Sequence, residues 1–144
     1  MKKITSIITI FVLGWIATSA YAGEYDFKPG LWETTTNVTF TGLSPQFAKM
    51  MEQKPFTEQY CMSEKDLFMN SENDCKYTRK RVSSRLLKVS MSCNSQNGNA
   101  TGKGEIHFNG RKVSGWFEMQ GRGPNGPMTT RNNFTSKYIG ACKE

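Results

Sequence analysis

A segment bounded by two cysteines, from Cys75 to Cys93, constrains the fold of this chain more than any other part of the sequence. Two runs with strand-forming composition flank a small polar turn, a pattern typical of a β-hairpin. If residues 83–85 form the loop, Val82 faces Leu86, and counting outward places Cys75 opposite Cys93. Directly opposed residues of an antiparallel pair have Cα atoms roughly 4.5–5.5 Å apart, which is within the range of a disulfide. The sequence therefore predicts a hairpin closed by a Cys75–Cys93 bond.

The first 22 residues have the pattern of a secretory signal peptide. Lys2 and Lys3 form a positive start, residues 4–16 are mostly apolar, and residues 19–22 offer an A-x-A cleavage site. A membrane anchor is the alternative, but the apolar run is short and broken by polar residues, and no second apolar run follows. We therefore expect cleavage after residue 22 and export of the remaining chain.

The remaining residues, 23–144, have the length of one domain and contain all four cysteines. An even number of cysteines in an exported chain favours disulfides, and the hairpin register leaves Cys61 to pair with Cys142. Redox or metal chemistry is the alternative, but the sequence has no C-x-x-C pair and no His or Cys cluster at zinc spacing. We expect two structural disulfides.

Strand patterns alternate with turn signals along the rest of the chain. A short helix is expected after Ser44-Pro45 and a helical turn within residues 63–70, and Asn109-Gly110 is predicted to form a two-residue hairpin turn. Such spacing predicts an all-β antiparallel meander, whose sheet curves strongly or forms an open barrel because a single domain must cover its inner face. The expected strands lie at residues 31–40, 57–62, 75–82, 86–93, 102–108, 113–120 and 128–138.

Candidate catalytic and metal-binding residues are few. His107 is the sole histidine and is expected on the solvent face of a strand, while neither Ser114 nor a cysteine has a visible base beside it. The carboxylates are scattered, and the methionines, whose thioethers suit Cu(I), are dispersed as in an ordinary core. We expect no enzymatic activity, with an envelope hydrolase the least supported function, and no cofactor or metal.

Positive charge is densest in the predicted hairpin. Without Lys2 and Lys3, 17 basic side chains stand against 12 acidic ones, a formal charge of +5. The hairpin suggests a non-enzymatic binding module that contacts anionic lipid, lipopolysaccharide or an envelope protein, or else a solvated surface that blocks edge-to-edge strand pairing. Nucleic acid is not an expected partner, because export separates the protein from the nucleic acids of the cell. The six basic residues are Lys76, Arg79, Lys80, Arg81, Arg85 and Lys88.

Carriage of a small apolar or lipid ligand inside the curved sheet is the alternative function. Aromatic side chains that line the interior or mouth of such a sheet favour an apolar ligand. Trp32, Trp116 and Phe117 are the candidate lining residues.

An ordered set of motifs resembles the bacterial "domain of unknown function 3617" family. Lys-Pro-Gly-Leu-Trp-Glu at residues 28–33 is similar to the opening signature of that family. The similarity continues through the cysteines, a Gly-Lys-Gly-Glu run at 102–105 followed by Phe108, and a closing Gly-Ala-Cys at 140–142. The resemblance covers nearly all of the chain after residue 22. It implies an exported envelope protein of Gram-negative bacteria that is located in the periplasm, with secretion as the alternative. It implies no established activity and therefore no functional residue that could be carried over.

Overall fold

The computed structural model describes residues 23–67, 74–95, 98–123 and 126–143. The predicted signal peptide and the end of the predicted helical turn at 63–70 lie outside the described residues. The described elements are β1 (Gly30–Thr41), α1 (Pro45–Met51), β2 (Phe56–Met62), the 3₁₀ turn η1 (Glu64–Leu67), β3 (Cys75–Ser83), β4 (Leu86–Ser95), β5 (Gly98–Asn109), β6 (Lys112–Gly123) and β7 (Gly126–Gly140).

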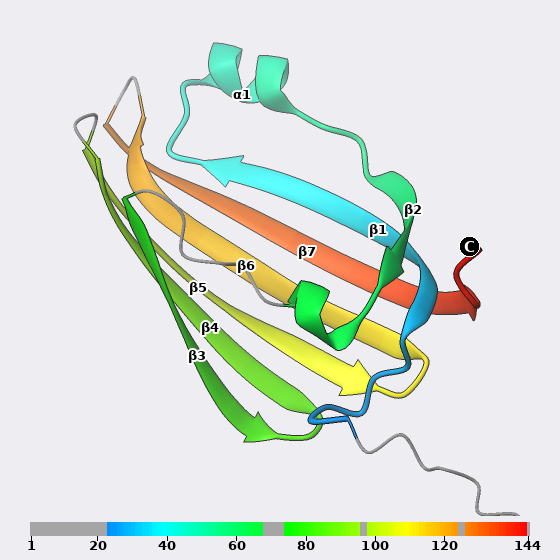
Figure 1. Ribbon diagram of the computed structural model, residues 1–144. Helices are drawn as coiled ribbons and strands as arrows, with labels where there is room; N and C mark the ends of the chain where they lie inside the picture. Colours follow the sequence, from blue (N-terminus) through cyan, green and yellow to red (C-terminus); the bar gives the residue numbers. More distant parts are fainter. Residues whose placement is uncertain (1–22, 68–73, 96–97, 124–125, 144) are drawn as a thin grey trace, which may run out of the picture.

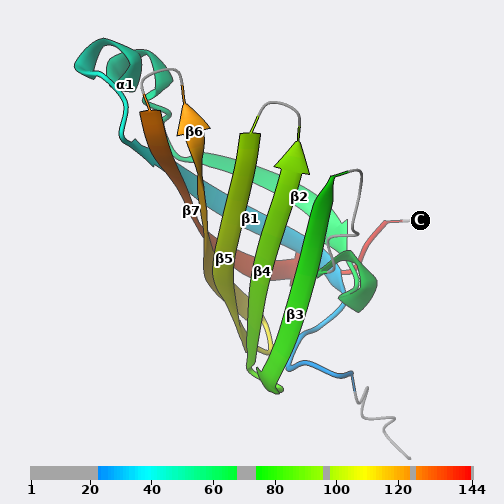
Figure 2. The same ribbon diagram turned by 90° about the vertical axis from the view of Figure 1, so that its left-hand side faces the viewer.

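All seven strands belong to one antiparallel sheet, in the order β2-β1-β7-β6-β5-β4-β3. β3 to β7 follow one another along the chain as neighbours, and β1 then pairs with β7 over most of its length. β2 and β3 are the two edges and do not pair with each other in the described part of the chain, so the sheet is strongly curved but open (Figures 1 and 2). The predicted fold is confirmed in its open form.

The hairpin of β3 and β4 has the predicted register. Cys75 lies opposite Cys93 with Cα atoms 4.0 Å apart, and the two cysteines form a disulfide. The turn itself was predicted wrongly, because Ser83 pairs with Leu86 and Val82 is left over as a bulge. A bulge adds one unpaired residue to a strand, so a two-residue turn with a bulge gives the same register as a three-residue loop.

The second disulfide also forms as predicted, between Cys61 on β2 and Cys142 beyond the end of β7. These cysteines are 81 residues apart, and their bond ties the edge strand β2 to the end of the chain. None of the helices in the described ranges has both the length and the apolar character needed to cross a bilayer.

The turn between β5 and β6 lies one residue later than predicted. Asn109 pairs with Lys112, so Gly110 and Arg111 form the turn in place of Asn109-Gly110. Gly110 has a φ of 61°, the positive value that tight hairpin turns need at their first central position. Glycine adopts this conformation at little cost, whereas asparagine does so less readily.

The predicted short helix is present, with Ser44 before it and Pro45 in its first turn. It stands beyond the end of β1 at the top of Figure 1 and buries none of its residues. The side chains of Phe47 and Met50 are 42% and 81% exposed. The helix is therefore an appendage of the sheet and does not cover its core.

The core fills one end of the concave face. Trp32, Leu87 and Phe108 are its most deeply buried large side chains. Trp32 donates a hydrogen bond of 2.9 Å from Nε1 to the Lys28 carbonyl and stacks on Phe27, with ring centroids 5.0 Å apart. This end of the sheet is therefore packed solid.

A segment that the sequence did not predict closes this end, the N-terminal segment formed by residues 23–29. Its Asp26 N–H donates to the Ser84 carbonyl at 2.8 Å, and the Gly110 N–H donates to the Asp26 carbonyl at 2.8 Å. The segment thereby crosses the tips of two hairpins and brings Tyr25 to Phe108, with ring centroids 4.8 Å apart.

Candidate ligand-binding site

Two phenylalanine rings form the floor of the concave face beyond the core. A Cβ built at Gly102 would lie 2.6 Å from Phe117 Cζ, and one at Gly104 would lie 2.8 Å from Phe117 Cδ2. Phe134 lies against Gly115 in the same way, since a Cβ there would be 2.7 Å from its Cζ. Each ring therefore occupies the place of a side chain that the neighbouring strand lacks, which keeps the face flat and apolar.

A cavity of about 70 Å³ lies over this floor. Its wall is almost entirely apolar, with Val89 and Ile106 beside the two rings and Leu67 of η1 contributing from the chain above the sheet. Arg79, on the edge strand β3, is the charged residue of the wall. Drug-sized ligands commonly occupy roughly 300–1,000 Å³, so the enclosed part has room for only a few carbon atoms.

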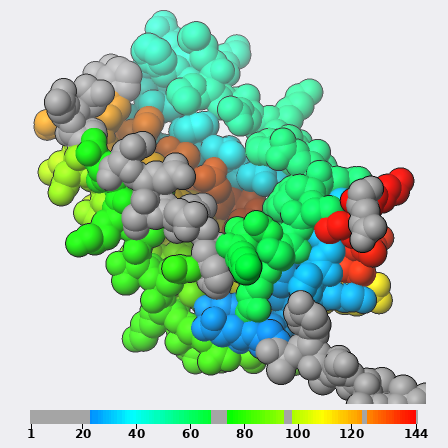
Figure 3. All heavy atoms as spheres, in the orientation of Figure 1, coloured from blue at the N-terminus to red at the C-terminus, as the bar shows by residue number. Residues whose placement is uncertain are grey.

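Further apolar side chains lie on the concave face toward the far ends of β1 and β6, with Asn132 and Thr130 of β7 between the two strands. Val38 and Phe40 share the concave face of β1, and Met119 follows Phe117 on the same face of β6. All three side chains are partly exposed. Figure 3 shows α1 and β2 along one side of this face and the hairpin of β3 and β4 along the other.

The three residues predicted to line an apolar site lie in different places in the structure. Trp32 is fully buried in the core, which leaves no surface for a ligand. Trp116 belongs to the cavity wall, but its ring lies under the guanidinium of Arg131 at 4.4 Å, on the face where Arg131 also pairs with Glu118. Phe117 also lines the cavity, from the concave face, because adjacent residues of a strand point to opposite faces.

The six basic residues of the hairpin do not form one surface. Arg79 and Arg81 lie opposite Val89 and Leu87 and share their concave face, whereas the lysines alternate with them on the convex face. Arg85 lies in the turn. The predicted anion-binding set is therefore divided between two faces and a turn: Lys76, Arg79, Lys80, Arg81, Arg85 and Lys88.

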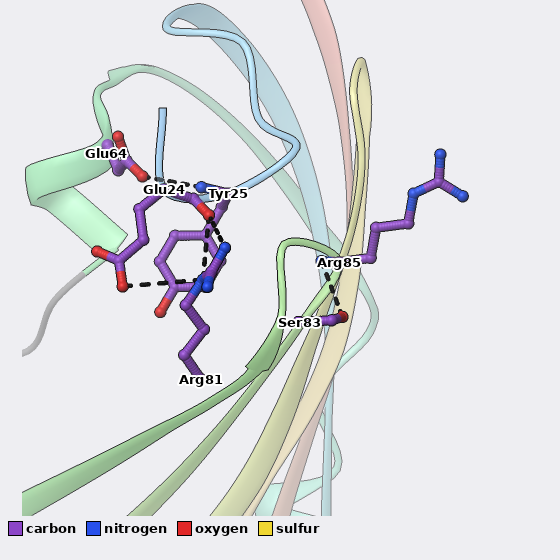
Figure 4. Close-up of polar contacts among 6 residues, drawn as sticks. All are labelled: Glu24, Tyr25, Glu64, Arg81, Ser83 and Arg85. Atoms are coloured by element: carbon purple, nitrogen blue, oxygen red, sulfur yellow. Dashed lines mark hydrogen bonds and ion pairs between the residues drawn. The ribbon is translucent and has the colours of Figure 1, made fainter. Parts of the chain in front are cut away.

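Two of these arginines hold the N-terminal segment. Figure 4 shows Arg81 turned toward Glu24 and the ring of Tyr25. Its Nη2 donates to the Glu24 carbonyl at 2.8 Å, and its Nε lies 3.9 Å from the Glu24 carboxylate. Arg85 Nε lies 3.3 Å from the Asp26 carboxylate. These contacts give both side chains a structural role.

The lysines of the hairpin are exposed on the convex face. Lys80 lies directly opposite Lys88, a pairing of like charges that is unfavourable on its own. Lys88 Nζ lies 3.0 Å from Glu105 Oε1, which offsets the repulsion and lowers the pKa of the Glu105 carboxyl through a hydrogen bond. Charged residues of this kind also protect an edge strand from pairing with another chain.

His107 is exposed on the convex face, as predicted, with Nε2 3.5 Å from Glu105 Oε2. The register places Ser114 directly opposite His107, a proximity that sequence analysis missed because it depends on the β5–β6 register. No hydrogen bond joins these two side chains in the structure. Among the described residues, no group of three His, Cys, Asp or Glu side chains could hold a metal ion.

The shifted pKa values belong to structural contacts and not to the cavity. Hydrogen bonds from Lys137 and Gln59 lower the pKa of the Glu33 carboxyl, and burial raises the pKa of the Tyr25 phenol. Catalytic sites usually place shifted groups in a cleft with a charge partner. Neither of these residues lines the cavity over Phe117, and Glu33, paired with Lys137, lines a separate hollow on the convex face.

Comparison with known proteins places the chain in a family. No curated protein and no solved structure matches it. The family model described as "Protein of unknown function (DUF3617)" matches residues 27–142, which is most of the chain. The resemblance inferred from the ordered motifs is thereby confirmed, and the chain belongs to the DUF3617 family.

Proposed function

We propose that this protein is a non-enzymatic binding protein of the Gram-negative periplasm that takes the apolar chain of an anionic amphiphile on its concave face. The observation that carries the proposal is the apolar cavity over Phe117 and Phe134, together with the cation of Arg79 in its wall. An apolar chain gains about 0.8 kcal/mol for each buried CH₂ group. A ligand with a carboxylate or phosphate at its end would combine this gain with an ion pair.

The size of the surface favours a chain over a compact ligand. The enclosed cavity accepts only a few carbon atoms, and the rest of the chain would lie across Phe117 and Met119 along β6. These side chains are partly exposed, so covering them removes apolar area from water. The ring of Phe117, which lies flat against glycines of β5, gives such a chain an even apolar surface to pack on.

Of the basic hairpin residues, Arg79 is the one this proposal uses. It is the hairpin residue with a positive charge that lines the cavity, whereas Lys80 lies on the other face of the sheet. Arg79 lies on the concave side of an edge strand, where its charge is close to both water and the cavity. Such a position suits a headgroup that stays solvated.

Export is supported by the signal-peptide pattern of the sequence and by the two disulfides. Disulfides persist in oxidising compartments such as the periplasm and are rare in the cytosol. The long-range Cys61–Cys142 bond and the hairpin bond together hold both edges of the open sheet. A periplasmic site would also bring the protein close to the lipids of both membranes.

The test is binding of dodecanoate and of dodecanol to the mature protein, measured by displacement of a fluorescent fatty-acid probe. Arg79→Gln should weaken dodecanoate about tenfold and leave dodecanol unchanged, because one charged hydrogen bond is lost. Val89→Phe should weaken both ligands by filling the cavity. Lys80→Gln is the matched control, since it removes a neighbouring charge on the opposite face. Equal effects of Arg79→Gln and Lys80→Gln, or no binding of dodecanoate by the wild type, would rule the proposal out.

A further inference from the structure

The convex face of the sheet carries a second hollow, of about 450 Å³, which the proposed function does not use. A row of polar side chains crosses four neighbouring strands at its base, and three of the four are short hydroxyl residues. His107 lies opposite Ser114, Ser114 opposite Thr135, and Thr135 opposite Thr35. Longer side chains stand on both sides of this row, so the short ones form the bottom of a trough.

One side of the trough carries an unbalanced positive charge. Lys112 lies directly opposite Lys137, and Lys137 lies opposite Glu33. Lys137 Nζ is 2.6 Å from Glu33 Oε1, so this carboxylate is already paired. Lys112 makes no ion pair with any described residue and faces a like charge, which is unfavourable until an anion is bound.

The other side of the trough carries an aromatic residue. A hollow of about 430 Å³ shares the base row and continues to Trp116 and Asn133. Arg131 holds the indole from one direction, with its guanidinium 4.4 Å from the ring and its Nη1 3.3 Å from Glu118 Oε2. Lys112 and Trp116 are four residues apart on β6, which is about 13 Å along a strand.

The hydroxyl groups at the base are available to a ligand. Ser114 and Thr135 are exposed, and neither side chain hydrogen-bonds to another described residue. The backbone groups beneath them are already used in the ladders of central strands, so a peptide cannot add to the sheet here. Recognition on this face must therefore come from side-chain hydroxyls, one amide, one indole and one cation.

We propose that this trough binds an acidic saccharide, a polyhydroxylated ligand with one carboxylate. The hydroxyls of Ser114 and Thr135 can each donate to and accept from sugar hydroxyls. Lys112 supplies the cation that the carboxylate needs, and Trp116 supplies a flat apolar surface at the other end of the trough. The site lies on the opposite face of the sheet from the apolar cavity and is independent of it.

The test is a titration of ¹⁵N-labelled mature protein with glucuronate, glucose and inorganic phosphate, followed by amide chemical shifts. Glucuronate should shift the amides of residues 112–116 and 133–137. Lys112→Gln should weaken glucuronate about tenfold, while glucose should bind the wild type about as weakly as it binds this variant. Thr135→Val should weaken both sugars, because it removes a hydroxyl and keeps the shape.

Lys76→Gln is the control, because it removes one lysine from the same face of the sheet far from the trough. The Lys76→Gln variant should bind glucuronate with the affinity of the wild type. All variants should unfold at the same urea concentration as the wild type. Phosphate that gives the same shifts with equal affinity would overturn the proposal, since the hydroxyls would then play no part. Absence of shifts with glucuronate, or equal losses in Lys76→Gln and Lys112→Gln, would also overturn it. Dodecanoate binding should be unchanged in the trough variants, so each proposal can fail without the other.

Discussion

The glycines beneath Phe117 provide a direct test of the concave floor. A Cβ at Gly104 would meet the Trp116 carbonyl oxygen as well as Phe117 Cδ2 at 2.8 Å. The carbonyl belongs to the backbone of β6 and cannot move unless the strand does. Overpacking of this kind typically costs about 1–3 kcal/mol, and the lower entropy of the unfolded chain returns about 0.4–1 kcal/mol. We therefore expect Gly104→Ala to reduce the free energy of unfolding by about 1.5 kcal/mol.

Alanine substitutions at two other glycines on the same face provide a comparison for the stability cost of Gly104→Ala. A Cβ at Gly102 would meet only side chains, the Phe117 ring at 2.6 Å and Met91 Cε at 3.3 Å. These can tilt away, so Gly102→Ala should cost about half as much as Gly104→Ala while pushing the ring into the cavity. A Cβ at Gly121 would meet Ala100 Cβ at 3.6 Å, an ordinary contact. Gly121→Ala should therefore be neutral or stabilise by about 0.5 kcal/mol.

Urea unfolding followed by tryptophan fluorescence, with both disulfides intact, would measure the three free energies. The expected order of stability is Gly121→Ala, then Gly102→Ala, then Gly104→Ala. Displacement of a fatty-acid probe on the same samples would show whether Gly102→Ala loses more affinity than stability. If Gly104→Ala is as stable as Gly121→Ala, then Phe117 does not lie against β5, and the floor of the proposed site is wrong.

Three further predictions concern the Cys75–Cys93 disulfide, the buried Trp32 and the charge of Glu105. Replacing Cys75 and Cys93 together by serine opens a loop with a sequence separation of 18 and should cost about 3 kcal/mol in urea unfolding; an unchanged midpoint would show that the bond contributes nothing. Trp32→Phe should cost about 2–3 kcal/mol, because it loses buried volume and leaves a carbonyl without its indole donor; a loss under about 0.5 kcal/mol would contradict the packing described. The carboxyl of Glu105 should titrate below its ordinary pKa by NMR and return upward in Lys88→Gln. Because its pKa is lowered by folding, the stability it contributes is present above the ordinary value and is lost as the pH falls through the folded value; an unchanged titration in the variant would refute the assignment to Lys88.

Local patterns were enough to predict the hairpin and its disulfide. The pairing of Cys75 with Cys93 depends only on counting outward from one turn, and it survived an error in that turn because the bulge at Val82 compensates. The position of Gly110 shows the limit of such reasoning. Asn109 and Gly110 were expected to form the turn together, but Asn109 stays in β5 and pairs with Lys112, while Gly110 takes a positive φ at the first position of the turn.

Long-range contacts explain what the sequence could not reveal. The N-terminal segment binds hairpin tips through backbone hydrogen bonds and through ion pairs with Arg81 and Arg85. These partners are more than 50 residues away in the sequence, so no local pattern marks the segment as part of the fold. The trough on the convex face depends on the register of β1 against β7 and of β7 against β6, which brings Thr35, Thr135 and Ser114 into one row. Each residue alone reads as an ordinary exposed strand position. Once the strand order was known, a search for short polar residues that lie opposite one another on the same face of neighbouring strands could have found the row.

The two adjacent residues Trp116 and Phe117 show how strand alternation separates the proposed sites. Both were expected to line one apolar interior, but neighbours on a regular strand point to opposite faces, so one ligand cannot contact both rings from one side of the sheet. The glycines of β5 place Phe117 in an apolar floor, while Arg131 and the hydroxyl row place Trp116 in a polar trough. A ligand whose binding is weakened equally by Arg79→Gln and by Lys112→Gln would contradict this separation. Independent losses, dodecanoate with the first variant and glucuronate with the second, are the result that the alternation requires.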